Sequence, residues 1–436
     1  MKQQILSVPA ALLLSGMSLL GGGYGFAQTG TAFAAGCTLS PTGADQSMEL
    51  QLAVNSCAIV QLTAGTFFVH DVGINQPVTV SGVSPFFTTL DARRMGRIFH
   101  IPLNPGGTGL GTMGGAPFTV TLKNIRFQNG STRFAPKGPI GGGAIENEGT
   151  TTLNLNNDDF RNNTTIAFGG AVHSTNESFL FAAVGSQVPQ TNVTASTFEY
   201  NSANEGGALD GDIGVLNVTG SSFRNTQLTG GTGRGGAIAT DDFEQALNVS
   251  NSNFTQNGDL TSPALGTPTY NGASSRGGAI STTARTTTVS NSTFFGNMAG
   301  NSGGAIQHTT GSMTVNNSNF TSNSAPGQFV SLGGAINDFN SSGLQINGSR
   351  FQTNSASSGG GVALFFSGRG MASITPTNSI ANTFFNANHA TGTTGGGVFG
   401  SRSGGSGGGL DLFVAGVTLT NVNFSNNTAA NGGGLY

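Results

Sequence analysis

Residues 277–306 decide the fold, and they contain Gly277-Gly278-Ala279-Ile280, then Phe294-Phe295-Gly296-Asn297, then Gly303-Gly304-Ala305-Ile306. The Gly-Gly motif returns after one unit, and a Phe with an Asn three residues later stands between its two copies. This shortest unit is 26 residues long. A repeating unit of this size indicates a solenoid, because one unit cannot bury its own apolar face.

Both motifs recur along most of the chain. The Gly-Gly-(Ala/Gly)-(Ile/Val/Leu) motif starts at Gly142, Gly169, Gly206, Gly235, Gly277, Gly303, Gly333, Gly359, Gly395, Gly407 and Gly432. The Phe-x-x-Asn motif starts at Phe160, Phe198, Phe254, Phe294, Phe320, Phe351, Phe385 and Phe424. The Phe follows the first Gly by 17 to 19 residues in most units, so longer gaps indicate insertions. The Gly395 copy is predicted to lie in such an insertion, because Gly407 keeps the spacing.

The segment before each Phe alternates like a β-strand, as in Leu247-Asn248-Val249-Ser250 before Phe254. We expect the Phe, and the aliphatic residue five positions earlier, to point inward. An Asn or Gly that suits a bend with positive φ stands three residues before Phe; these residues are Asn157, Gly220, Asn251, Asn291, Asn317, Gly348 and Asn421. The sequence therefore predicts an all-β parallel β-helix with about three strands per coil and stacked Asn side chains. A β-propeller or a β-sandwich is the alternative.

Composition excludes several other classes of protein. The chain has 71 Gly, 31 Phe, only 8% charged residues and a net charge of −3. Collagen needs Gly at every third position, and disordered chains combine few aromatic residues with high net charge. A nucleic-acid-binding protein would show a basic surplus, so no nucleic-acid partner is expected.

The N-terminal residues predict export and a cap. Residues 1–35 have one charge, Lys2, and an apolar run from Ile5 to Leu20, which is typical of a signal peptide; a membrane anchor is the alternative. Cleavage after Ala27 or Ala34 fits the pattern. Residues 36–57 are predicted to form a short capping helix, with Cys37 and Cys57 joined by a disulfide in an oxidising compartment. Residues 58–127 read as N-terminal coils, and residues 128–436 hold the repeats. After signal removal, no transmembrane segment is predicted.

Residues 124–436 resemble the repeat region of the polymorphic outer membrane proteins first described in chlamydiae, which alternate Gly-Gly-Ala-Ile and Phe-x-x-Asn tetrapeptides. The resemblance implies a right-handed parallel β-helix of the pectin-lyase type that is displayed at the cell surface. Some members of that family act as adhesins, with the tetrapeptides implicated. This sequence departs from the family because no C-terminal autotransporter β-barrel follows the repeats. The chain stops within a unit at Tyr436, so we expect either that the natural protein continues or that a partner covers this edge.

Aligning the units on their first Gly predicts one acidic strip. Four residues after that Gly lie Glu146, His173, Asp210, Ala239, Ser281, Gln307, Asn337, Ala363 and Asp411; six residues after it lie Glu148, Thr175, Asp212 and Asp241. Adjacent coils would place Asp212 and Asp241 about 5 Å apart. That distance suits a Ca²⁺ site of Asp210, Asp212 and Asp241, or a hydrolytic carboxylate pair. The ordinary interpretation is a solvated face, since no Arg or Lys shares these columns.

The favoured interpretation is a secreted or surface protein, with association to the outer membrane open, that binds an extracellular glycan or protein or serves as structure. No cofactor besides a weak Ca²⁺ site is expected. One alternative is a polysaccharide lyase or glycoside hydrolase that uses Glu146, His173, Asp210, Asp212 and Asp241. The other alternative is a passenger fragment of a longer autotransported protein.

A separate basic cluster consists of Asp91-Ala92-Arg93-Arg94 and Arg97. We interpret it as a loop beside an N-terminal coil.

Overall fold

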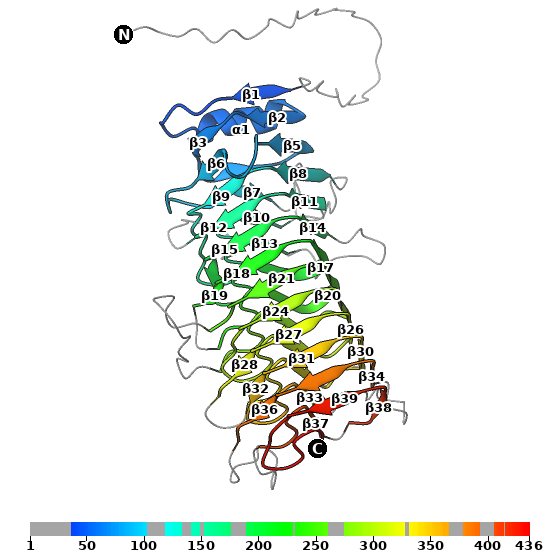
Figure 1. The fold of residues 1–436 in the computed structure, drawn as a ribbon. Helices are drawn as coiled ribbons and strands as arrows, with labels where there is room; N and C mark the ends of the chain where they lie inside the picture. Colours follow the sequence, from blue (N-terminus) through cyan, green and yellow to red (C-terminus); the bar gives the residue numbers. More distant parts are fainter. Residues whose placement is uncertain are drawn as a thin grey trace, which may run out of the picture. The chain divides into compact units, whose positions relative to one another are not determined.

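The computed structural model describes residues 36–102, 118–132, 141–148, 152–175, 189–229, 232–259, 274–327, 331–365, 378–392, 405–413 and 415–436. Within them the strands of successive coils are parallel and lie one above the next from β1 to β39 (Figure 1). The fold is therefore the parallel β-helix that the repeats predict.

Each coil contributes to two long sheets. In the 22-stranded sheet, two runs of strands are joined by β17 (Leu209–Thr219) and β20 (Ile238–Ser250), which extend from one run into the other. We call the run that begins after each Gly-Gly pair the corner run. Besides β17 and β20 it contains β4 (Val72–Gly73), β7 (Phe99–Ile101), β10 (Ile145–Asn147), β13 (Val172–Ser174), β22 (Ile280–Thr282), β25 (Ile306–Thr309), β29 (Ile336–Phe339), β33 (Val362–Phe365) and β37 (Leu410–Phe413).

We call the second run the polar run. Besides β17 and β20 it contains β1 (Cys37–Leu39), β2 (Ile59–Leu62), β5 (Val78–Ser81), β8 (Thr119–Lys123), β11 (Thr152–Asn156), β14 (Gln190–Thr194), β23 (Thr286–Ser290), β26 (Ser312–Asn316), β30 (Gly343–Asn347), β34 (Asn378–Ala381) and β38 (Val417–Thr420).

The other long sheet, the phenylalanine sheet, carries the Phe of each repeat. It contains β3 (Gly65–Phe68), β6 (Thr88–Asp91), β9 (Arg126–Gln128), β12 (Asp159–Arg161), β15 (Thr197–Glu199), β18 (Ser222–Arg224), β21 (Asn253–Thr255), β24 (Thr293–Phe295), β27 (Asn319–Thr321), β31 (Arg350–Gln352), β35 (Phe384–Asn386) and β39 (Asn423–Ser425). Short strands follow it at β16 (Ser202–Ala203), β19 (Gln227–Leu228), β28 (Ser324–Ala325), β32 (Ser355–Ala356) and β36 (His389–Ala390).

The repeated Phe side chains fill the centre of the coils. From Phe160 to Phe385 they are at most 1% exposed. Neighbouring ring centroids between Phe127 and Phe424 lie 4.7 to 5.0 Å apart, which is the spacing of the strands themselves. The aliphatic residues five positions earlier, such as Val289, are buried as predicted.

The two Gly residues of each pair are required for different reasons. Gly277 has φ +65°, a conformation that other residues rarely adopt. A Cβ on Gly278 would lie 2.1 Å from the carbonyl oxygen of Gly304 in the next coil, so no larger residue fits. The predicted bends before each Phe are also confirmed, because the seven Asn and Gly residues named for them have φ between 48° and 62°.

The Asn of each Phe-x-x-Asn motif forms a buried ladder. Nδ2 of Asn297 donates to Oδ1 of Asn323 at 2.9 Å and to the carbonyl of Phe254 at 3.0 Å, and Oδ1 of Asn323 also accepts the Asn297 backbone N–H. The same contacts recur at Asn354 and Asn388. Each amide thus holds three coils together and leaves no buried donor unpaired in the ladder.

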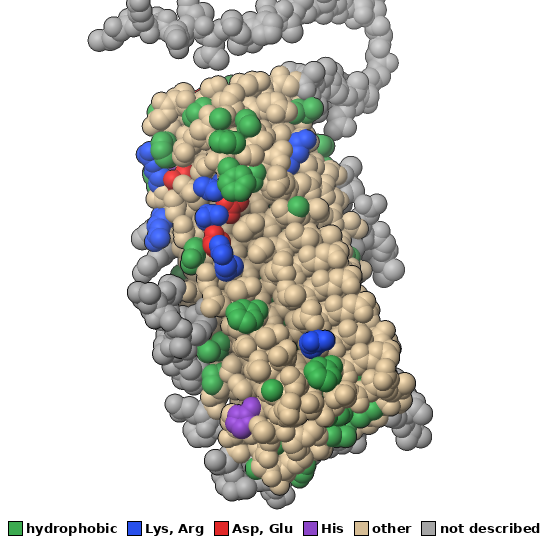
Figure 2. Space-filling view, in the orientation of Figure 1, with side chains coloured by type: hydrophobic (Ala, Val, Ile, Leu, Met, Phe, Trp, Pro, Cys, Tyr) green, Lys and Arg blue, Asp and Glu red, His purple; other side chains and the backbone are tan. Residues whose placement is uncertain are grey.

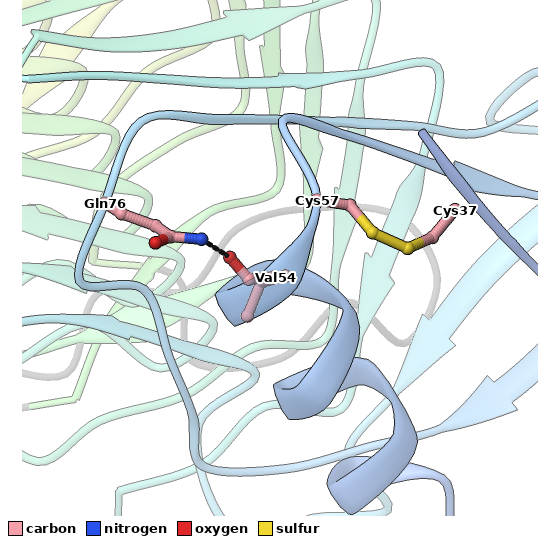
Figure 3. Close-up of a disulfide and its surroundings, with 4 residues drawn as sticks. All are labelled: Cys37, Val54, Cys57 and Gln76. Carbon is pink, nitrogen blue, oxygen red and sulfur yellow. Dashed lines mark hydrogen bonds between the residues drawn. A yellow bond between two sulfur atoms is a disulfide. The ribbon is translucent and has the colours of Figure 1, made fainter. Parts of the chain in front are cut away.

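The helix α1 (Ser47–Ser56) packs against the first coils through the buried side chains of Leu50, Ala53 and Val54. Figure 3 shows the Cys37–Cys57 disulfide at its end, with Cα atoms 6.0 Å apart, and Nε2 of Gln76 donating to the carbonyl of Val54 at 2.6 Å. The helix thus lies at the N-terminal coil, where the sheet would otherwise be open.

Three sequence predictions lie outside the described residues: the signal peptide, its two cleavage positions and the inserted copy at Gly395. Within the described part of the chain, the structure contains no helix with the length and apolarity that a membrane span needs.

Candidate functional site

The acidic strip lies where the corner run passes through β10, β13 and β17. These strands pair in register, so Glu146, His173 and Asp210 are direct neighbours in consecutive coils. The column continues as the spacing of the repeats predicts, through Ala239, Ser281, Gln307, Asn337, Ala363 and Asp411. Asp212 lies two residues after Asp210 and therefore on the same side of β17.

The imidazole of His173 is the centre of the cluster. Its Nδ1 lies 2.8 Å from Oε1 of Glu146, and its Nε2 lies 2.9 Å from Oδ2 of Asp212 and 3.4 Å from Oδ2 of Asp210. A Cβ on Gly141 would lie 2.1 Å from the same Nδ1, so a glycine is needed there to admit the ring. The strand pairing and this glycine together hold three carboxylates around one imidazole.

These side chains are buried, and the interpretation of the strip as a solvated face is wrong for them. Glu146 is fully buried, and His173 and Asp210 are 3% and 4% exposed. The side chain of Asp212 is 23% exposed and forms the solvent side of the cluster. Because buried carboxylates are costly unless they are paired, this arrangement differs from an ordinary surface strip.

Asp241 does not complete the cluster as predicted. A register shift after Gly211 interrupts the pairing of β17 with β20, so Asp212 is not directly opposite Asp241. The carboxylate of Asp241 instead lies 3.6 Å from the guanidinium of Arg234. One donor atom each from His173, Asp210 and Asp212 lies within 4.8 Å of the others. The side chains whose donor atoms converge therefore differ from the predicted three aspartates: they include an imidazole, and Asp241 acts on Asp210 only through its charge.

Arg97 also reaches the cluster, although the two columns of the acidic strip contain no Arg or Lys. Its Nη2 lies 3.7 Å from Oε2 of Glu146 and donates to the carbonyl of Gly141 at 3.2 Å. Arg97 lies outside the strands, just before β7, as the loop interpretation predicts, but its side chain is only 6% exposed. Glu148, the other glutamate of the predicted strip, lies 3.1 Å from Nε2 of His100.

A degenerate motif hid Arg97 from the sequence analysis. Phe99 pairs with Ile145, so Gly96-Arg97-Ile98-Phe99 occupies the frame of Gly142-Gly143-Ala144-Ile145. In that frame Arg97 takes the place of the second Gly. Extending the Gly alignment by one coil toward the N-terminus places Arg97 in the column of Gly143 and His100 in the column of Glu146.

The cluster changes the protonation of its members. Burial disfavours the charged imidazole, but the charge of Glu146 and hydrogen bonds to Asp212 and Glu146 raise the pKa of His173 well above its ordinary value. Burial, and then the charge of Asp212, raises the pKa of Asp210 well above the usual range. Burial also acts on Asp212, but its hydrogen bond and attraction to His173 lower its pKa. Such divergent carboxyl groups are more frequent at functional sites than on ordinary surfaces.

Glu244 on β20 is a second buried acid that the sequence analysis missed. It is 1% exposed and lines a small cavity together with Thr191, Gly211 and Leu216. Burial, and then the charge of Asp212, raises its pKa to about 8. It lies in the part of β20 that departs from the repeat, so no column of the alignment contains it.

Opposite charges alternate on the outer side of the phenylalanine sheet. The guanidinium groups of Arg126 and Arg161 both lie 2.8 Å from Asp159, and Arg161 and Arg224 both contact Glu199. Figure 2 shows the mixed blue and red side chains over β9, β12, β15 and β18. Since the charges compensate one another, this group offers little net charge to a partner.

The polar run presents three rows of outward side chains that pair in register. The rows are Thr119, Thr152, Gln190, Val215, Ala246, Thr286, Ser312 and Gly343; Thr121, Asn154, Asn192, Asn217, Asn248, Thr288, Thr314, Gln345, Ser379 and Thr418; and Lys123, Asn156, Thr194, Thr219, Ser250, Ser290, Asn316, Asn347, Ala381 and Thr420. Among these described residues Lys123 is the only charged one. In Figure 2 the surface over β14, β20, β26 and β30 is almost entirely tan.

Comparison with known proteins leaves the family and the activity of the chain open. No family model and no curated protein sequence matches the chain. A solved catalytic domain of a GH87 α-1,3-glucanase in complex with tetrasaccharides is similar at 11% identity and a TM-score of 0.48, and covers 92% of this chain and 66% of that one. The mannuronan C-5 epimerase A-module of Azotobacter vinelandii is similar at 11% identity and a TM-score of 0.39, and covers 90% and 94%. The chain thus spans about two thirds of the glucanase domain.

Proposed function

We propose that this chain is a secreted or surface-displayed β-helix that binds a neutral polymeric glycan along its polar run. The observation that carries the proposal is the set of three in-register rows, of which the central row consists entirely of hydroxyl and amide side chains and the other two consist mostly of them. Parallel strands repeat these groups about every 4.8 Å. A polymer with hydroxyl groups at regular intervals can meet many such groups at once, and many weak contacts add to a useful affinity.

The amides of the central row are held ready for such contacts. Nδ2 of Asn217 donates to Oδ1 of Asn192 at 2.8 Å, and Nδ2 of Asn248 donates to Oδ1 of Asn217 at 2.9 Å. An amide nitrogen has two hydrogens, so this ladder fixes each side chain and uses only one of them. A ligand therefore meets ordered donors whose rotamers are already restricted.

The charge of the polar run favours a neutral glycan over an acidic one. Recognition of uronate or sulfate groups generally uses Arg or Lys, and the described rows contain Lys123 alone. Secretion is supported by the pattern of residues 1–35 and by the Cys37–Cys57 disulfide. Surface display, adhesion or origin as a passenger segment rests on the resemblance to polymorphic outer membrane proteins.

Cleavage of a bound glycan is the second candidate. It is favoured by the convergence of Glu146, His173, Asp210 and Asp212 on the corner run, which adjoins the polar run through β17. In the conformation described here Glu146 is fully buried and Asp210 is 4% exposed, so a sugar ring could contact Asp212 only. Binding therefore has the better support.

Affinity electrophoresis through gels that contain neutral or uronate polysaccharides tests the proposal. The double variant Thr288→Glu with Thr314→Glu places charges in the central row, and we expect it to lose retardation at least tenfold. The matched control is Thr293→Glu with Thr321→Glu on the phenylalanine sheet, which should bind like the wild type. Retardation by uronate gels alone, or equal binding by both variants, would contradict the proposal. Release of reducing or unsaturated ends by the wild type would favour the second candidate.

A further inference from the structure

We infer that Nε2 of His173 and the carboxylates of Asp210 and Asp212 form a binding site for one divalent transition-metal ion of the Zn²⁺ class. This inference is independent of the glycan proposal, because it concerns the buried cluster of the corner run rather than the polar run.

The donor atoms already have the spacing of metal ligands. Nε2 of His173 lies 2.9 Å from Asp212 and 3.4 Å from Asp210. Ligands bound to one tetrahedral Zn²⁺ at about 2.1 Å lie about 3.4 Å from one another. The distance from Nε2 to Asp212 must increase from 2.9 Å to about 3.4 Å for an ion to enter among the three atoms. A small outward shift of the partly exposed Asp212 side chain is sufficient.

Glu146 fixes the imidazole in the form that a metal requires. Its Oε1 lies 2.8 Å from Nδ1 of His173 and can only accept a hydrogen when ionised. The Nδ1–H of His173 therefore donates to Glu146. Without metal, Nε2 lies at hydrogen-bond distance from Asp212 and carries a proton. Metal binding releases that proton, and the lone pair of Nε2 then faces the two aspartates. A carboxylate on the far nitrogen of a metal-bound histidine is a frequent outer partner of such sites.

One buried carboxylate oxygen of the cluster needs a partner. In the described part of the chain, Oδ2 of Asp210 accepts no hydrogen bond, although it lies 3.4 Å from Nε2 of His173. Asp210 is 4% exposed, so water does not replace that partner easily. A cation between the aspartates and His173 would satisfy this oxygen and offset the crowding of three carboxylates around one imidazole.

The ligand set selects the class of metal. Ca²⁺ and Mg²⁺ prefer sites made entirely of oxygen atoms. An imidazole nitrogen with two carboxylates suits Zn²⁺, Mn²⁺, Co²⁺ or Ni²⁺. Three protein ligands also leave one position open toward the solvent side of Asp212, which is typical of sites that bind a further molecule.

The test uses the full chain, freed of metal with a chelator and titrated separately with Zn²⁺ and Ca²⁺ by calorimetry and thermal melting. We expect one Zn²⁺ per chain, a rise in melting temperature with Zn²⁺, and affinity for Zn²⁺ at least 100-fold above that for Ca²⁺. Asp212→Asn and His173→Gln should weaken Zn²⁺ binding at least tenfold. Asp45→Asn and His70→Gln change an acid and an imidazole that contact each other beside α1, and they should change Zn²⁺ binding less than threefold.

A spectroscopic measurement keeps the test decisive if His173→Gln folds poorly. Co²⁺ bound in place of Zn²⁺ should give visible absorption bands of a four- or five-coordinate ion, and Asp212→Asn should alter them. An unchanged melting temperature with Zn²⁺, stronger binding of Ca²⁺, or an equal loss of Zn²⁺ binding in Asp45→Asn would overturn the inference. Each of these outcomes leaves glycan binding by the polar run unaffected.

Discussion

The coils around β25 and the coils around β13 share one backbone frame, but they bury different chemistry in the same column. Gln307 and Asn337 occupy it in β25 and β29, where Nδ2 of Asn337 donates to Oε1 of Gln307 at 2.8 Å. His173 and Asp210 occupy it in β13 and β17. Both pairs are at least 96% buried. The column therefore accepts neutral amides in β25 and β29, whereas β13 and β17, and also β37 with Asp411, bury titratable groups there at an additional cost.

The largest effect is expected when the backbone frame that both groups of coils share is disrupted. Phe320→Asp places a charge in the phenylalanine stack, where the side chain is fully buried. Loss of the ring costs about 3–5 kcal/mol and burial of a carboxylate adds several more, so we expect the variant to unfold or to lose most of its repeat structure. Phe295→Asp is the matched control, because that neighbouring ring is 50% exposed and should tolerate the change. Circular dichroism melting curves measure both, and equal melting temperatures would refute the assigned register.

The next test concerns the cost of burying an acid beside the cluster. The pKa of Glu244 is about 8, against an ordinary value of 4.5. Because the folded state keeps the proton and the unfolded state releases it, the wild type should lose stability as pH rises from about 4.5 to 8. A difference of this size corresponds to about 5 kcal/mol. Glu244→Gln removes the titrating group. The free energy of unfolding of the variant should therefore rise progressively relative to that of the wild type as the pH increases from about 4.5 to 8.

Urea unfolding at several pH values between 4 and 9 measures this gain. Glu49→Gln on the exposed side of α1 is the control, and its free energy of unfolding should differ from the wild type by a small amount. A difference between Glu244→Gln and the wild type that stays constant with pH would show that Glu244 does not titrate in this window.

The frame could be predicted from the sequence because each rule is repeated. Asn291 and Asn317 recur at the same distance from a Phe, and steric rules for positive φ apply to each one separately. Neighbours in the column, such as Glu146 and His173, also follow from spacing alone. Their burial does not follow, because alternation predicts one face of a strand in water, whereas all three residues of β10 and of β13 are buried. The alignment of the repeats did not identify Arg97, because it lies in a degenerate motif. It did not identify Glu244, because that residue lies in an irregular part of β20.

A third test compares the inner and outer Asn ladders. Asn323→Ala leaves the N–H groups of Asn297 and the carbonyl of Phe294 without their partner in the core. Unpaired buried groups cost about 1–3 kcal/mol each, so we expect a loss of about 3 kcal/mol. Asn248→Ala in the half-buried outer ladder should cost less than about 1 kcal/mol, because water can replace its contacts. Similar losses in chemical denaturation would contradict the distinction between the two ladders.

The smallest expected loss of stability is that of Gln307→Glu. This variant tests whether the column that contains Glu146, His173 and Asp210 tolerates an acid in other coils. Nε2 of Gln307 donates to the carbonyl of His308 and to Oγ1 of Thr309, and a carboxylate would lose both contacts in a side chain that is 4% exposed. We expect a loss of about 2 kcal/mol at pH 8. The loss should diminish toward pH 4, since protonation restores a donor.

Gln345→Glu on the exposed polar run is its matched control and should be nearly neutral at both pH values. If Gln307→Glu is also neutral, the column accepts charge anywhere and the acids of the cluster need no ligand to explain them. If it is costly, then Glu146 and Asp210 persist in the same frame against stability. Arg97 and His173 offset this cost for Glu146, and the proposed cation at His173, Asp210 and Asp212 would offset it for Asp210.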